Sequence, residues 1–492
     1  MSLDPRTPVL VGVAAVSQRH EDPQRAPEAI KLMTRALEHA ADDAGNYDLL
    51  TMADSVRVPR GLWDYSDPGR LVADRLVGNR ARTELAEIGV LQTTLLGGAA
   101  RDIAAGKADV VLVTGGEAKY RSRRAEITGK RLSITLQPAS ARPDVVLKPA
   151  DEIMHPLEIE HGLVMPVGQY AMIENATRAA AGLSIEEHRR EIARMWSDFS
   201  RVAAGNPAAW NRSVVAADTI REASDTNRML AFPYAKLHNS NWNVDQAAGL
   251  ILCSVEAARR YGIAEDRWVF PLAVAESNFM QPISARGQVH RSPGFAHAGA
   301  RVLTHAGLTI DEVAHLELYS CFPVAVRVQA AEMGIAAARQ LTVTGGMAFA
   351  GGPLNNFVLQ GLVRTAELLR AERGSHALLT AVSGMLTKQG VSLWSSQPPA
   401  QSFAFDDVSA DVERDVDTRD VVAPEDGHAT VATYTVMYDG AEPVRALLLC
   451  DLDGGRRTMV ATDDRDLAAT MTREEPCGRR VKIVGGRCAG IA

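Results

Sequence analysis

Two reactive side chains lie close together in residues 316–323, where Tyr319 and Cys321 are separated by one serine. A thiol can act as a nucleophile or as an acid and base, and a tyrosine can donate to a carbonyl or take up a proton if its pKa is lowered. The alternatives are a small cysteine buried in the core and a tyrosine that only satisfies its own hydroxyl. We therefore name Cys321 and Tyr319 as candidate catalytic residues.

A second stretch suited to chemistry runs from residue 345 to residue 356 and is dense in glycine. It leads into residues 357–373, whose apolar spacing predicts a helix. A glycine turn followed by a helix N-terminus leaves backbone N–H groups that can receive a carbonyl or phosphate oxygen. The pattern predicts a binding surface for such an oxygen at Gly345, Gly346, Gly351, Gly352 and Asn355.

A third candidate is the basic run of residues 119–131, which holds six basic residues and one acidic residue. Such a run can bind phosphate groups or can simply form a solvated charged surface. Arg121, Arg123 and Arg124 are the phosphate contacts that we name.

The elements around these candidates repeat along the chain. Residues 9–16 and 109–117 predict buried strands, and residues 27–41 predict a helix with one apolar face. Similar segments return at 268–275, 377–384 and 301–306, so that Arg301 and His305 follow Arg35 and His39 by 266 residues. This order predicts two duplicated α/β halves with mostly parallel sheets.

Two regions break the repeat. Residues 119–236 lack the strand pattern and predict an inserted, mostly helical loop subdomain over a site, with a helix capped by Ser184 and Glu187. From residue 397 the chain predicts short strands joined by Asp-Gly turns, which favours a small β-barrel. We expect an N-terminal half at 1–258, a second half at 259–396, and a β domain at 397–492.

Composition excludes several classes of protein. Hydrophobic residues make up 46% and charged residues 23%, which is typical of a globular protein, and a net charge of −7 gives no general attraction for nucleic acid. Five scattered cysteines argue against a disulfide framework and against a zinc or other metal site. No apolar run is long enough to span a membrane, and the N-terminus lacks a signal-peptide pattern, so we expect a cytoplasmic protein.

The motifs resemble those of thiolases, over roughly residues 5–395. Residues 345–356 are similar to the histidine loop of these enzymes, with Gly352 in the place of the histidine. Residues 319–322 occupy the Asn-Glu-Ala-Phe loop, and Ser383 and Gly384 lie where thiolases have Cys-x-Gly. The nucleophilic cysteine would fall near Gly89. The whole pattern resembles the type-1 thiolase-like proteins of actinobacteria, often labelled acetyl-CoA acetyltransferases.

The resemblance implies a thiolase αβαβα layered sandwich with an OB-like C-terminal domain. It also implies a monomer or homodimer in lipid metabolism that binds coenzyme A or an acyl-CoA thioester, with no covalent cofactor and with Ser383 and Gly384 among the binding residues. Because two cysteines and a histidine of the usual set are replaced, ordinary thiolase turnover is not expected. Two alternatives stay open: an aldol-type carbon–carbon lyase that uses Tyr319 or Cys321, and a scaffold whose barrel binds a partner or covers a dimer surface.

Overall fold

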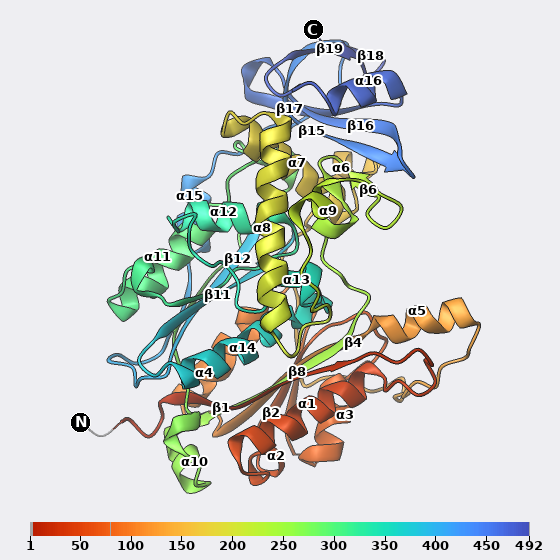
Figure 1. Cartoon of the computed structure of the whole chain (residues 1–492). Helices are drawn as coiled ribbons and strands as arrows, with labels where there is room; N and C mark the ends of the chain where they lie inside the picture. Colours follow the sequence, from red (N-terminus) through yellow and green to blue (C-terminus); the bar gives the residue numbers. More distant parts are fainter. Residues whose placement is uncertain (1–2, 79, 492) are drawn as a thin grey trace.

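The first sheet carries the N-terminal half in the computed structural model, which describes residues 3–78 and 80–491. Its strands lie in the order β1-β8-β4-β2-β3-β5 (Figure 1). Every strand of this sheet runs in the same direction except β8, which is antiparallel to both of its neighbours. The strands are β1 (Pro8–Gln18), β2 (Ser55–Pro59), β3 (Arg82–Ala86), β4 (Val110–Ala118), β5 (Val145–Leu147) and β8 (Asp245–Ser254).

The second sheet has the order β10-β11-β12-β9-β13 and also contains one reversed strand, β12. Its strands are β9 (Phe270–Ser277), β10 (His315–Glu317), β11 (His376–Ser383), β12 (Lys388–Ser395) and β13 (Ala404–Asp407). The order β9-β12-β11-β10 repeats β1-β8-β4-β2, so the predicted duplication and the mostly parallel sheets are confirmed.

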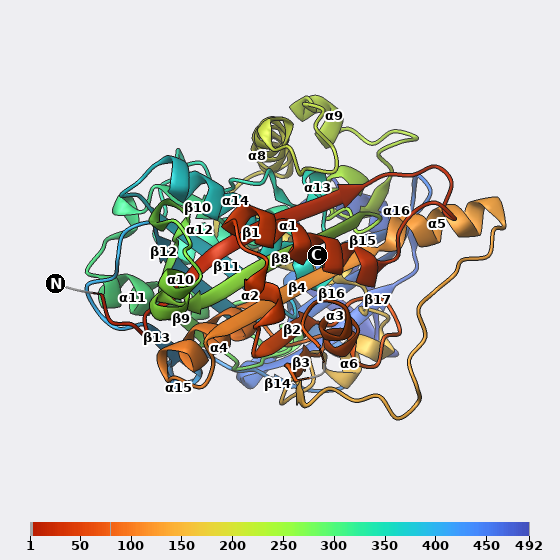
Figure 2. The same cartoon turned by 90° about the horizontal axis from the view of Figure 1, so that it is seen from below.

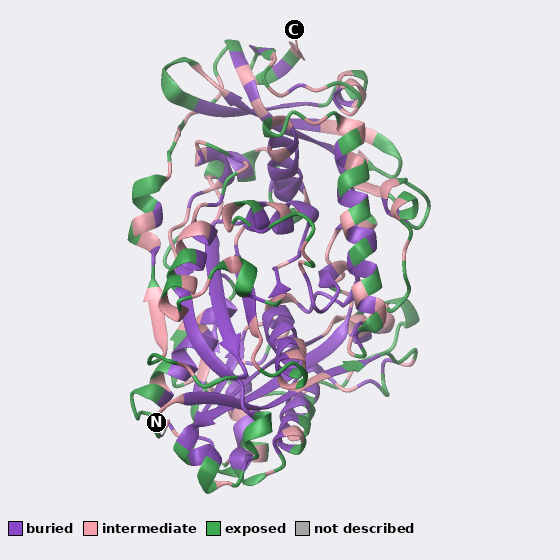
Figure 3. Ribbon diagram, turned by 60° about the vertical axis from the view of Figure 1, so that its left-hand side comes forward, coloured by how far each residue is buried: buried purple, intermediate pink, exposed green. Residues whose placement is uncertain are grey.

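Two helices, α4 (Gln92–Ala104) and α14 (Phe357–Ala371), form a layer between the sheets, because both contact strands of each half. On the outer face of the first sheet, α1 (Ala29–Ala44) buries the predicted apolar residues Ile30, Met33 and Leu37 (Figure 2). Its counterpart in the second half is α11 (Gly294–Ala306), which packs on β9 and β12. Figure 3 shows that the central strands of both sheets are buried, whereas the edge strands β5 and β13 are partly exposed.

Short helices complete the two halves. They are α2 (Asp48–Thr51), α3 (Pro68–Leu76), α10 (Val255–Arg260), α12 (Pro323–Glu332), α13 (Gly346–Phe349) and α15 (Ser409–Asp415), with the 3₁₀ turns η2 (Glu265–Arg267), η3 (Ile283–Ala285), η4 (Ile310–Glu312) and η5 (Leu354–Asn356).

The inserted region is helical, as predicted, and contains the long helix α8 (Ile185–Gly205) that crosses the front of Figure 1. Ser184 and Glu187 form the expected capping box at its start. The other elements are α5 (Lys119–Thr128), α6 (Pro156–Glu160), α7 (Pro166–Ala180), α9 (Ala217–Arg221), β6 (Met229–Ala231), β7 (Tyr234–Ala235) and η1 (Lys236–His238). Strand β5 also belongs to this region, and it pairs with β3 at the edge of the first sheet.

The C-terminal region is rich in strands, as expected. Its sheet follows the path β14-β17-β16-β15-β18-β19, and β6 of the inserted region joins it through β15. The elements are β14 (Asp420–Val421), β15 (Gly427–Asp439), β16 (Glu442–Asp451), η6 (Asp453–Gly455), β17 (Arg456–Thr462), α16 (Arg465–Met471), β18 (Arg480–Val484) and β19 (Arg487–Ile491). The described strands pair along an open path, so the OB-like barrel is not confirmed.

The C-terminal region is fastened to the inserted region through α7. Arg178 is fully buried; its guanidinium donates to Glu475 at 2.6 and 2.9 Å and to the Tyr434 hydroxyl at 3.2 Å. Asn175 donates to the main-chain oxygens of Phe232 and Tyr434. That this region covers a dimer surface stays a prediction. The domain boundary at 397 also stays a prediction, and β13, which follows residue 397, belongs to the second sheet.

In the described part of the chain, we find no helix whose length and apolar character would allow it to cross a membrane.

Candidate active site

The N-terminal ends of α4 and α14 meet in the middle layer. The Gln92 side-chain amide donates to Asn355 Oδ1 at 3.0 Å, and Asn355 Nδ2 donates to the Arg60 carbonyl at 2.7 Å. Asn355, named from the sequence as a binding residue, therefore joins the two helix ends. Because the N-terminus of a helix carries a partial positive charge, two such ends favour a carbonyl or anionic oxygen placed near them.

Gly89, at the position expected for a thiolase nucleophile, has a left-handed backbone with φ of 103°. A Cβ atom added here would lie 2.9 Å from Pro149 Cγ. A cysteine therefore does not fit without strain and a shift of Pro149.

A buried amine lies at this same position. Lys388, the first residue of β12, is 3% exposed and its Nζ donates to the Gly89 carbonyl at 2.7 Å. Burial lowers the pKa of Lys388, and the negative charges of Glu276 and Asp151 oppose that shift. Burial therefore makes the charged form of this amine less favourable than it is in water.

Glu276, at the end of β9, brings a second titratable group to the first turn of α4. Its carboxylate accepts hydrogen bonds from the hydroxyls of Thr93 and Thr94, the latter at 2.9 and 3.0 Å. Burial raises the pKa of Glu276 to about 7, although both hydroxyls favour the ionised form. Thr93 and Thr94 therefore position a carboxyl that can exchange a proton near neutral pH.

Tyr319 and Cys321 lie between β10 and α12, and both are largely enclosed. Burial raises the pKa of Cys321 to about 12 and raises the pKa of Tyr319 far above its ordinary value. Both groups therefore keep their protons at neutral pH, where they can donate a hydrogen bond but are poor bases. The catalytic role of each stays a prediction.

The segment after β11 meets the inserted region at Tyr170. The Tyr170 hydroxyl donates to the Gly384 carbonyl at 3.2 Å, and its ring stacks on Phe322 with centroids 4.5 Å apart. Ser383 is the last residue of β11 and lies opposite Lys388 in the ladder. Ser383 and Gly384 therefore lie near the buried amine and near Cys321, whose presence further raises the pKa of Tyr170.

Arg286 lies in the same part of the protein. Its Nη2 donates to the Met385 carbonyl and its Nε donates to the Gln281 carbonyl, while the buried Nη1 has no hydrogen-bond partner. Burial lowers the pKa of Arg286 to about 10. The guanidinium holds the turn that follows Gly384.

The glycine stretch of residues 345–356 is packed closely against other segments, and several of its amides already have acceptors in the protein. The amides of Gly345, Gly346 and Gly352 donate to Thr342 Oγ1, Thr344 Oγ1 and the Asn241 carbonyl at 3.0, 3.2 and 2.9 Å. A Cβ at Gly345 would lie 2.3 Å from the Ala203 amide nitrogen, and one at Gly351 would lie 2.1 Å from Gln246 Oε1. These glycines allow α8 and Gln246 to approach closely, and their role in ligand binding stays a prediction.

The three arginines of the basic run also have protein partners. Arg121 is buried and donates to the main-chain oxygens of Ala26 and Ser133, whereas Arg123 pairs with Glu126 and Arg124 with Glu21. A phosphate contact would have to compete with these groups, and it stays a prediction.

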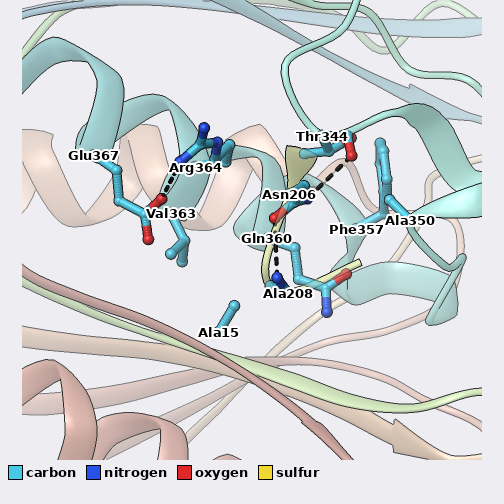
Figure 4. Close-up of a pocket in the computed structure, with 10 residues that line it drawn as sticks. All are labelled: Ala15, Asn206, Ala208, Thr344, Ala350, Phe357, Gln360, Val363, Arg364 and Glu367. Carbon is cyan, nitrogen blue, oxygen red and sulfur yellow. Dashed lines mark hydrogen bonds and ion pairs between the residues drawn. The ribbon is translucent and has the colours of Figure 1, made fainter. Parts of the chain in front are cut away.

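A small hollow beside the glycine stretch is drawn in Figure 4. Its volume of about 20 Å³ is close to the room that one water molecule needs. Asn206 bridges it by donating to the Thr344 carbonyl at 3.0 Å. The hollow is too small for a thioester, and none of the binding residues named from the sequence lines it.

Lys388, Glu276, Tyr170 and Arg286 were not predicted from the sequence. Lys388 and Glu276 each stand alone among uncharged residues, and a single charged residue in a segment that predicts a buried strand can indicate a functional site.

Among residues 3–78 and 80–491, no three His, Cys, Asp or Glu side chains gather as a metal site would need.

Comparison with known proteins gives a consistent result. The chain matches no protein-family model and no curated protein sequence. It is similar to the crystal structure of a monomeric SCP2-thiolase-like protein type 1 from Mycobacterium smegmatis, with 29% identity, 99% of both chains covered and a TM-score of 0.83.

Two further structures share the fold over 80% of this chain. An aldolase, Ltp2-ChsH2(DUF35), matches with 18% identity, 99% of its chain and a TM-score of 0.58, and an acetyl-CoA acetyltransferase from Syntrophomonas wolfei matches with 16% identity, 100% of its chain and a TM-score of 0.57. The match to the Mycobacterium smegmatis structure includes both duplicated halves and the C-terminal region. This chain is therefore a protein of thiolase-like fold.

Proposed function

We propose that this protein binds coenzyme A or an acyl-CoA thioester where the N-terminal ends of α4 and α14 meet, and that no cysteine-linked acyl enzyme forms there. The observation that carries the second part is Gly89. Its left-handed backbone and its contact with Pro149 leave no room for a nucleophilic side chain. By the resemblance of the motifs, Gly89 and Gly352 are the positions at which a thiolase would have its cysteine and its histidine.

Calorimetric titration with coenzyme A and acetyl-CoA tests the binding. We expect saturable binding, together with no thiolysis of acetoacetyl-CoA. If no binding is detected at a ligand concentration of about 1 mM, the binding free energy is weaker than about 4 kcal/mol and the proposal is wrong.

A second candidate is cleavage of a carbon–carbon bond in an acyl-CoA by a retro-aldol step. A base removes the proton of the substrate's 3-hydroxyl, the bond between C2 and C3 breaks, and its electron pair passes to the thioester enolate while an aldehyde or ketone leaves. The specific observation in favour is Lys388, a buried amine whose Nζ lies 2.7 Å from the Gly89 carbonyl oxygen and whose pKa is lowered by burial. Neutral Tyr319 and Cys321 are available as donors to the enolate oxygen.

The test compares Lys388→Met, Tyr319→Phe and Cys321→Ser on a panel of 3-hydroxyacyl-CoA substrates, with Lys130→Met at an exposed position as the control. We expect loss of turnover in the Lys388 variant and weaker turnover in the other two. Unchanged turnover in all three variants would show that these residues do not carry the reaction. We also propose a cytoplasmic role in lipid metabolism, in keeping with five free cysteines.

A further inference from the structure

One loop covers two glycines of the candidate site, Gly89 and Gly384. Residues 149–154 link β5 to α6, and Pro149 Cγ lies 2.9 Å from the place that a Cβ of Gly89 would take. In the same way, Ile153 Cγ2 lies 3.3 Å from the place of a Cβ at Gly384. The room that the two glycines leave open is thus filled by side chains of this loop.

The loop is held by side-chain packing, because Ile153 and Met154 pack against the core. Within the described part of the chain, residues 149–154 make no hydrogen bond between main-chain groups, and Ala150, Asp151 and Glu152 are exposed. Its two ends are fixed, because the Leu147 carbonyl accepts from the Glu87 amide at 2.9 Å and His155 caps α6. A segment with exposed residues and without main-chain hydrogen bonds opens at a lower free-energy cost than a strand or helix, here mainly that of exposing Ile153 and Met154.

The loop covers a buried amine. Lys388 Nζ donates one hydrogen bond, to the Gly89 carbonyl, and the negative charges of Glu276 and of Asp151 in this loop also act on it. An amine can donate more than one hydrogen bond, and a buried polar group without its partners is costly. A carbonyl oxygen of a ligand would supply a further acceptor once the loop has moved away.

We propose that residues 149–154 are a movable cover over the candidate site, which must lift before a thioester reaches Gly89, Gly384 and Lys388. The identity of the ligand rests on the proposed function, but the movement of the cover does not. The two can therefore be tested separately.

A disulfide that locks the cover provides the test. The side chains of Thr387 and Ile153 both approach the Cβ position at Gly384, with their Cγ2 atoms 2.5 and 3.3 Å from it. In the double variant Ile153→Cys/Thr387→Cys, the oxidised protein is locked, and the same protein after reduction is its matched control.

The first measurement is the rate at which an amine-acetylating reagent modifies Lys388, followed by peptide mass spectrometry, with exposed Lys130 as the internal reference. We expect the locked form to react about tenfold or more slowly than the reduced form, because Lys388 is reached only when the cover opens. Equal rates in the two forms would overturn the inference.

The second measurement is the affinity of each form for coenzyme A. We expect about tenfold or more weaker binding by the locked form, and equal binding would also overturn the inference. If no form binds coenzyme A while the locked form still protects Lys388, the proposed function fails and the cover stands.

A loosened variant keeps the inference testable if the disulfide does not form. Ile153→Ala removes the contact with the Gly384 turn, and it should speed the modification of Lys388 in the full-length protein. Ile159→Ala, at a residue that is 52% exposed, is the control and should leave the rate unchanged. An unchanged rate in Ile153→Ala would contradict the proposed movement.

Discussion

At the scale of single residues, Gly89 and Lys388 decide what chemistry this site can carry. The left-handed glycine excludes a side chain at the start of α4, and the lysine from β12 brings an amine to the same point. Glu276 adds a carboxyl whose pKa of about 7 allows it to change charge near neutral pH. A carboxyl with this pKa can exchange a proton near neutral pH, and a cysteine at position 89 would meet Pro149.

Restoring a cysteine at Gly89 should destabilise the protein instead of creating a thiolase. We expect Gly89→Cys to lower the free energy of unfolding by about 2–4 kcal/mol, because strain at a positive φ adds to the contact with Pro149. Urea denaturation measures the change. Gly78→Cys is the matched control, since Gly78 has φ of 95° and no atom within 4 Å of its added Cβ. Equal losses in the two variants would mean that Pro149 moves aside at no cost.

Glu276 should make stability depend on pH. Its pKa is raised from 4.5 to about 7, so between these values the folded state holds a proton that the unfolded state has lost. Stability then falls as pH rises from about 4.5 to 7, by up to about 3 kcal/mol, and changes little above that.

Glu276→Gln should remove this part of the pH dependence, measured by urea denaturation at several pH values. Exposed Glu265→Gln is the control and should leave the profile unchanged. The remaining slope belongs to other buried carboxyls with raised pKa, such as Glu117 and Glu317. Identical profiles in Glu276→Gln and the parent would contradict the assignment.

At the scale of elements, α7 joins three parts of the chain. Its Tyr170 contacts the turn after β11, and its Asn175 and Arg178 hold the C-terminal sheet. The turn after β11 and the C-terminal region are therefore connected through one helix.

Arg178→Ala should weaken this connection. The side chain is fully buried, whereas its partner Glu475 is 36% exposed and keeps part of its hydration. We expect a loss of about 2–4 kcal/mol in the free energy of unfolding. Arg190→Ala, at a half-exposed ion pair with Glu186, should change it by less than about 0.5 kcal/mol. A loss in Arg178→Ala as small as in the control would show that the C-terminal region is held by apolar contacts alone.

At the scale of the whole molecule, one edge of each main sheet is extended by a strand from outside the repeated halves. The inserted strand β5 pairs with β3, and β13 pairs with β9. An unpaired strand edge offers backbone groups to a second chain, so β5 and β13 remove the edges of β3 and β9 from such pairing. The similar protein from Mycobacterium smegmatis is described as monomeric.

Two truncations separate the role of β13 from that of the C-terminal sheet. A chain that ends at residue 416 keeps β13 on β9, whereas one that ends at residue 396 exposes the β9 edge. We expect both to lose the contacts of α7, but only the shorter chain to associate strongly in light scattering. An equal mass distribution for the two truncations would show that β13 does not protect this edge.

The sequence by itself determined the fold class. Apolar spacing in segments such as 27–41, and the return of Arg35 and His39 as Arg301 and His305, predicted the helices and the duplication, because side-chain periodicity follows directly from secondary structure. The Ser184 and Glu187 capping box was also readable, since it is a local interaction.

Only the tertiary structure decided what surrounds the reactive groups. Lys388 meets Gly89 across 299 residues, and Glu276 meets Thr93 across 183 residues, so no local pattern could join them. The high pKa of Cys321 and the internal bonds of the glycine stretch likewise arise from burial, which depends on the packing of distant segments. Local geometry is encoded by neighbouring residues, whereas proton affinity and access to the site are set by the complete fold.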